Sequence, residues 1–89
     1  MNIQDAQNTI VSMGKGNPGA IKVLSDVLAQ LGEDTFSAVV QGLRVMKFEG
    51  PAIWLCYKDY ADQDLNRFVA MVRERNADMQ RLVNRAIGR

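Results

Sequence analysis

The sequence predicts an all-α fold, a small bundle of four to five helices with a long C-terminal helix. Apolar residues recur at spacings of three and four along most of the chain, as they do on one face of a helix. Capping residues and glycines mark the ends of these segments. The one ambiguous apolar run has no second strand candidate to pair with. With 89 residues, the chain is expected to form one helical domain, residues 1–89.

Two helices are predicted in the first third of the chain, over about residues 2–13 and from Asn17-Pro18 to Gly32. Asn is a favoured N-cap, and Pro at the first helical position loses no hydrogen bond. Gly14 and Gly32 stand at the two C-terminal ends, where a helix often closes with a left-handed residue. The apolar stripe of the second helix comprises Ile21, Leu24, Val27, Leu28 and Leu31.

A third helix is predicted from about residue 34 to residue 46, followed by a connection over residues 47–50. Gly42 lowers its helix propensity by roughly 1 kcal/mol relative to Ala and would let a neighbouring helix approach closely. The next run, residues 52–57, is apolar on every side, which fits a buried strand or a buried helix. We expect a helix, because a lone strand leaves its backbone groups unsatisfied.

The last predicted helix runs from Asp62, a good N-cap, to about Ile87, with no Gly or Pro before Gly88. Arg75 is the one polar residue on its apolar stripe. The stripe comprises Leu65, Phe68, Val72, Met79, Leu82 and Ala86.

Such a helix would be about 37 Å long, whereas a domain of this size has a radius of gyration of about 12 Å. Its far end should therefore project from the monomer with apolar residues exposed, which predicts a homo-oligomer. The alternative is a helix that wraps the full width of the domain.

The composition argues against an enzyme. The chain has no His, the commonest general base and metal ligand near neutral pH. Its single Cys, Cys56, lies in an apolar run and is expected to be an inert core residue. Capping and ion pairing account for Asp59, Asp62 and Asp64. We therefore expect no catalytic residue, no metal site and no cofactor.

Charge and hydropathy indicate where the protein acts. Eleven Lys and Arg against ten Asp and Glu leave a net charge of +1, which argues against nucleic-acid binding. The N-terminus lacks the features of a signal peptide, and no apolar stretch reaches the roughly 20 residues that span a membrane. We expect a cytoplasmic protein without a membrane partner.

The segment Lys15-Gly16-Asn17-Pro18-Gly19 is the candidate anion site. Its glycines let backbone approach a ligand, and the following helix N-terminus offers free N–H groups and a partial positive charge. Lys15 adds a full charge beside them. The alternative is a plain interhelical turn with an Asn cap, because any such turn uses these residue types.

Three aromatic residues, Trp54, Tyr57 and Tyr60, follow at intervals of three and lie along one side of a helix. Such a group usually anchors a core, but an exposed edge of Trp54 or Tyr57 would stack on a flat ligand. An arginine from a neighbouring subunit, for which Arg75 is the candidate, would complete a phosphate site.

The motifs Gly-Asn-Pro-Gly-Ala at residues 16–20 and Ile-Trp-Leu-Cys-Tyr-Lys-Asp at residues 53–59 resemble those of small phage and prophage proteins without assigned function. The resemblance implies a viral protein acting in the cytoplasm of a bacterial host. Many such proteins capture a host signalling molecule or bind a host protein. We therefore expect a non-catalytic, oligomeric protein that sequesters a phosphate-bearing, nucleotide-like ligand. The alternative is a helical adaptor or inhibitor that binds a host protein through its long C-terminal helix or its Trp54 surface.

Overall fold

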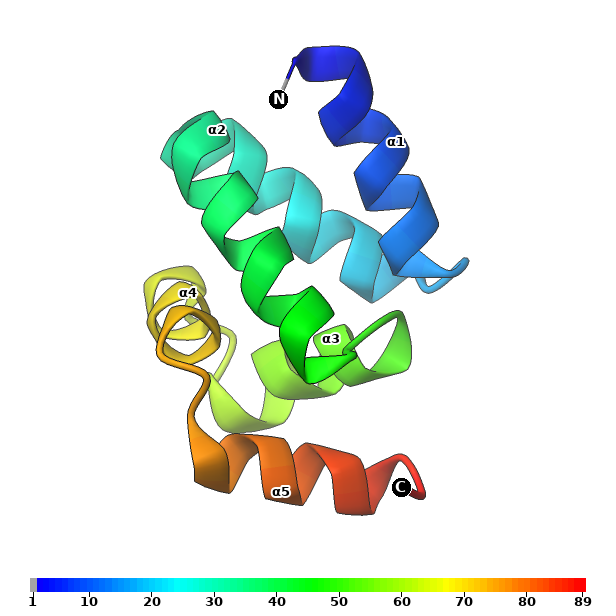
Figure 1. Cartoon of the computed structure of the whole chain (residues 1–89), viewed down its shortest axis with the longest axis vertical. Coiled ribbons are helices and arrows are strands. Elements are labelled where there is room, and N and C mark those ends of the chain that lie inside the picture. The colour runs from blue at the N-terminus through cyan, green and yellow to red at the C-terminus, as the bar shows by residue number, and fades with distance from the viewer. Residues whose placement is uncertain (1) are drawn as a thin grey trace.

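Five α-helices and one turn of π-helix make up the part of the chain that the computed structural model describes, residues 2–89 (Figure 1). The Cα radius of gyration is 11.6 Å. The prediction of an all-α fold with up to five helices is therefore confirmed. The elements are α1 (Ile3–Gly14), α2 (Pro18–Met46), α3 (Pro51–Leu55), the π-helix η1 (Cys56–Tyr60), α4 (Leu65–Arg73) and α5 (Ala77–Ala86).

The start of α2 is confirmed at the predicted capping residue. The Asn17 side chain accepts a hydrogen bond from the Ala20 backbone N–H at 2.9 Å, and Pro18 occupies the first helical position. The end of α1 differs by one residue, because Lys15 takes the left-handed conformation in place of Gly14. Gly14 stays helical and packs so closely on Ile21 that a Cβ at this position would clash with Cγ1 of that side chain.

Helix α2 turns sharply at Gly32, whose φ of 89° and ψ of 174° are not helical. The second and third predicted helices are thus the two arms of α2, joined by one residue (Figure 1). The predicted close approach at Gly42 is also confirmed. A Cβ at this position would lie 2.7 Å from the Val72 carbonyl oxygen in α4, so the two helices meet at a residue without a side chain.

Residues 52–57 are helical, as expected, and α3 continues directly into η1. The wider π-helical turn is closed by a hydrogen bond from the Ala61 N–H to the Cys56 carbonyl, 2.9 Å long. Cys56 is fully buried in the core, as its apolar surroundings predicted. Burial raises the pKa of its thiol to about 12.

We expect the stability of the protein to fall above pH 9 because of this thiol. In the unfolded chain Cys56 ionises near its ordinary pKa of 9.0, whereas the folded chain keeps it protonated. Each pH unit between about 9 and 12 should therefore cost about 1.4 kcal/mol of unfolding free energy. Urea unfolding of the wild type and of Cys56→Ala across this range measures the difference. Equal pH slopes in the two proteins would contradict the assignment.

The predicted long C-terminal helix over residues 62–87 is wrong. Asp64, not Asp62, caps α4 by accepting from the Arg67 N–H at 3.1 Å. The helix then ends at Arg73, and α2 is the longest helical element of the chain. Arg75, the polar residue on the predicted stripe, adopts a left-handed φ of 50° where the chain turns.

A second helix starts immediately after this turn. The Asn76 side chain accepts from the Met79 N–H at 2.9 Å, which caps α5. Helix α5 lies across the lower end of the molecule in Figure 1 and contacts α3 and η1. Its apolar residues Met79 and Val83 are buried in the monomer. Met79 is therefore covered within the monomer, whereas Leu82 is only partly buried and Ala86 is exposed.

No helix within residues 2–89 is both long and apolar enough to cross a lipid bilayer.

Candidate functional site

The residues predicted to bind ligand lie in three separate places. Lys15 lines a pocket between the C-terminal ends of α1 and α2. Gly19, Trp54 and Tyr57 line a second pocket at the start of α2. Arg75 lies in the α4–α5 turn and lines neither of them. Gly16 and Asn17 form the turn between α1 and α2 and also line neither pocket.

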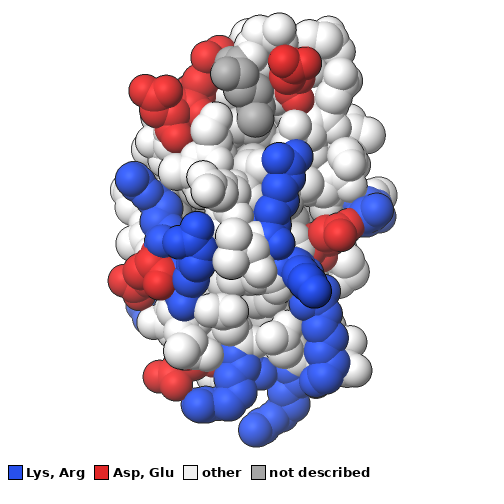
Figure 2. Space-filling view, in the orientation of Figure 1, with Lys and Arg blue, Asp and Glu red and all other residues white. Residues whose placement is uncertain are grey.

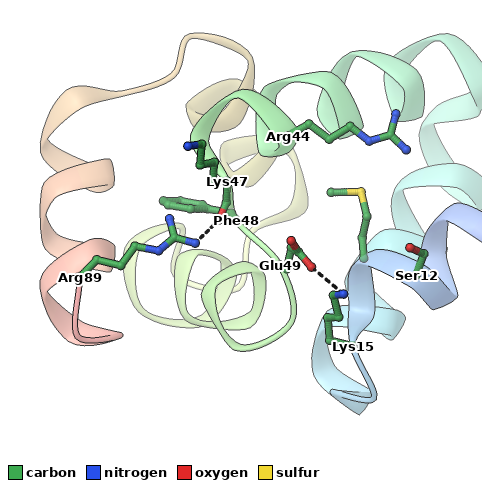
Figure 3. A pocket seen from close by; sticks show the side chains of 8 residues that line it. Ser12, Lys15, Arg44, Lys47, Phe48, Glu49 and Arg89 are labelled. Carbon is green, nitrogen blue, oxygen red and sulfur yellow. Dashed lines mark hydrogen bonds and ion pairs between the residues drawn. The ribbon is translucent and has the colours of Figure 1, made fainter.

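The first pocket, here called the basic pocket, has a volume of about 450 Å³. Four cationic side chains from segments far apart in the sequence line it, against one carboxylate side chain, Glu49 (Figure 3). Figure 2 shows Lys and Arg side chains gathered over the lower half of the face that is turned to the viewer. The four cationic residues are Lys15, Arg44, Lys47 and Arg89.

Two of these cations are engaged by other groups of the protein. Lys15 Nζ lies 3.2 Å from a carboxylate oxygen of Glu49. The Arg89 guanidinium donates to the carbonyl oxygens of Met46, at 3.4 Å, and of Lys47. These carbonyls belong to the C-terminal end of α2, where a cation is favourable because the helix dipole is negative there.

The other two cations have no such partner. Within residues 2–89, neither Arg44 nor Lys47 forms an ion pair, and both side chains are exposed. The wall beside them is apolar, because Phe48 is fully buried and Met13 nearly so. A hydrogen bond of 2.7 Å from the Gly50 N–H to the Met13 carbonyl ties the loop to α1. The pocket therefore offers at least two uncompensated positive charges on a fixed frame.

Sequence reasoning found Lys15 but missed Arg44, Lys47 and Arg89. The first two lie at the C-terminal end of α2, where basic residues are common for capping reasons alone. The pocket forms because the ends of α1 and α2 and residue 89 lie close together in the fold. No local sequence pattern indicates that these three segments are neighbours. For Arg89 alone there was a signal, the excess of six Arg over four Asp and Glu in residues 61–89.

The second pocket, here called the aromatic pocket, has a volume of about 330 Å³. The structure brings Gly19 against Trp54, since a Cβ on Gly19 would lie 2.5 Å from Cδ2 of the indole. Trp54 and Tyr57 are half-buried, and their ring centroids are 6.0 Å apart. The residues that line it are Pro18, Gly19, Lys22, Val23, Asp26, Trp54, Tyr57 and Gln63.

The acidic residues after η1 have local partners. Asp62 pairs with the Arg67 guanidinium at 3.0 Å, and Asp64 caps α4. Among the described residues, no three His, Cys, Asp or Glu side chains come together in a group that would hold a metal ion.

No protein-family model matches the chain, and no curated protein or solved structure matches it.

Proposed function

We propose that the protein is a non-catalytic binding protein that captures a small phosphate-bearing ligand in the basic pocket. The observation that carries this proposal is that four cationic residues, Lys15, Arg44, Lys47 and Arg89, line one pocket together with a single carboxylate side chain, Glu49. The volume of about 450 Å³ lies within the range of small-molecule sites, roughly 300 to 1,000 Å³.

Phosphate suits this pocket for two reasons. Arg44 presents a planar guanidinium, which binds two phosphate oxygens at once, and the lysines add compact charges. A bound dianion would also offset the positive charges of Arg44 and Lys47, which form no ion pair within residues 2–89. Context from the phage-like motifs supports a ligand of the host cell, such as a signalling molecule.

The turn, the aromatic rings and Arg75 do not line one common pocket that could hold a single nucleotide. Lys15 belongs to the basic pocket, whereas Trp54 lies in the aromatic pocket. The proposal therefore keeps the phosphate group and places it between α1, α2 and residue 89. The adaptor alternative loses part of its first surface, because Met79 on the stripe of the C-terminal helix is buried. Its second surface, around half-buried Trp54, remains partly open.

Pyrophosphate is the direct probe of this proposal. We expect calorimetric binding that weakens as salt is added, since exposed charges carry the interaction. At a hundred times its dissociation constant the ligand should add roughly 2.7 kcal/mol of stability. No phosphate release is expected during incubation. Absence of binding at low salt would refute the capture function, and steady phosphate release would refute its non-catalytic character.

Arg44→Glu, which reverses the charge, should weaken pyrophosphate binding at least about tenfold. The reason is the loss of a charge-assisted hydrogen bond of roughly 1.5–3 kcal/mol. Arg73→Glu is the matched control, since Arg73 is also exposed near a helix C-terminus but lines neither pocket. Equal weakening by both variants would indicate attraction to the net charge alone.

Lys47→Gly tests the pocket without risk to folding. Lys47 has a left-handed φ of 60°, which glycine adopts without the cost of a Cβ. We expect the variant to melt at the same temperature or higher and yet to bind pyrophosphate more weakly. Unchanged affinity would remove Lys47 from the site.

A further inference from the structure

We infer that the aromatic pocket is a second ligand site, which takes an uncharged planar nitrogen heterocycle of nucleobase size. The inference goes beyond the proposed function, because no residue lines both pockets. It rests on the wall formed by Trp54, on the placement of Gln63 and on the charge balance of the rim.

The Trp54 ring forms a rigid wall of the pocket. One side of the indole packs on Gly19 so closely that any Cβ would lie 2.5 Å from Cδ2 and Cε3. Tyr57 lies next to it at 6.0 Å, tilted by 34°. Tyr57 is itself held by buried Phe68, at 5.9 Å and in an edge-to-face geometry. The two half-buried rings are therefore fixed by the core while remaining partly open to a ligand, and flat groups stack on such rings.

Backbone geometry brings Gln63 to the same pocket. The π-helical turn η1 is followed by Asp62 and Gln63, which both adopt left-handed conformations, with φ of 52° and 57°. The Gln63 N–H donates to the Tyr57 carbonyl at 2.9 Å, which holds the residue in place. Such π-helical turns and consecutive left-handed residues without glycine are costly, and they cluster at functional sites.

The polar groups of the pocket select the ligand class. The Gln63 side chain is exposed and makes no hydrogen bond within residues 2–89, so its amide offers both donors and an acceptor. Lys22 and Asp26 pair with each other at 2.9 Å and leave the rim without net charge. This balance favours an uncharged ligand over an anion. A pure hydrocarbon would cover the amide without offering it a partner, which is unfavourable.

The size of the pocket agrees with this class. Its volume of about 330 Å³ is at the lower end of small-molecule sites, roughly 300 to 1,000 Å³. We expect one bicyclic ring to occupy this space, stacked on Trp54 or Tyr57 and within reach of Gln63. The ring nitrogens and exocyclic groups of a nucleobase complement the amide.

Trp54 is the only tryptophan of the chain, so its fluorescence reports on the pocket directly. We expect adenosine or guanosine to quench this emission saturably. Trp54 is excited at the red edge of indole absorption, where the nucleoside does not absorb. Calorimetry under the same conditions should give the same dissociation constant. Nucleosides that neither quench Trp54 nor release heat would overturn the inference.

Gln63→Ala should weaken nucleoside binding about fivefold, as expected for the loss of about one net hydrogen bond. Gln41→Ala is the matched control, because Gln41 is exposed on α2 and lines neither pocket. Equal affinities of the two variants would contradict the role of Gln63.

Pyrophosphate separates this inference from the proposed function. It should bind without quenching Trp54, because the basic pocket contains no tryptophan. Nucleoside binding without pyrophosphate binding would support the aromatic site and refute the phosphate site. The reverse pattern would refute the aromatic site alone.

Discussion

Replacing Met79 with aspartate is expected to unfold the protein or to bring it close to unfolding. Met79 is 1% exposed and packs in the core from α5. Its loss should cost about 2–5 kcal/mol of packing, and the buried carboxylate adds a further penalty of several kcal/mol. That sum is comparable to the whole stability of a small domain, about 5–15 kcal/mol. Circular dichroism with urea denaturation measures the change.

Ala77→Asp is the control for this substitution. Ala77 is exposed in the first turn of the same helix, where an acidic side chain is neutral or slightly favourable. A Met79→Asp variant that stays folded and instead changes its mass in light scattering would contradict the packing of α5. That result would restore the projecting helix and its oligomer interface.

Gly42→Ala should destabilise the protein by about 1–3 kcal/mol, as overpacking usually does. Alanine is the better helix former by roughly 1 kcal/mol, so helix propensity alone predicts the opposite sign. The contact decides the outcome, because the new Cβ would lie 2.7 Å from the Val72 carbonyl oxygen. A backbone atom cannot turn aside, so α2 and α4 must separate.

Urea unfolding of Gly42→Ala beside Gln41→Ala tests this contact. Gln41 is the preceding, exposed position of the same helix arm, and its substitution should change the unfolding free energy by no more than about 0.5 kcal/mol. A stabilised Gly42→Ala protein would mean that α4 does not pack on α2 at this point.

The sequence was informative where structure is specified locally. Asn17 and Pro18 predicted the start of α2 because a cap and a fixed φ act within a few residues. Gly42 predicted a close helix contact, although not the partner helix. The break at residues 74–76 was missed because no Gly or Pro marks it and the apolar spacing continues on both sides of it. Asn76 was the only capping signal there, and Arg75 carries a left-handed conformation without being a glycine.

The sites were less predictable than the helices. Lys15, Gly19, Trp54 and Tyr57 were each singled out, but in one site instead of two pockets. Which residues share a pocket depends on how the arms of α2 and the helices that follow pack together. The turn at Gly32 and the path of α5 determine that packing. No local sequence pattern fixes the direction in which the chain leaves Gly32 or the direction of α5.

The turn at Gly32 also offers a place to attach the protein to a surface. Gly32 is exposed, and a Cβ placed there would meet no side chain within 4 Å apart from those of its two neighbours in the chain. The arms that lead from it to the two pockets are each about 20 Å long. A flexible linker inserted at this apex would interrupt few contacts. Immobilised through such a linker, the protein would present both pockets to solution for binding measurements.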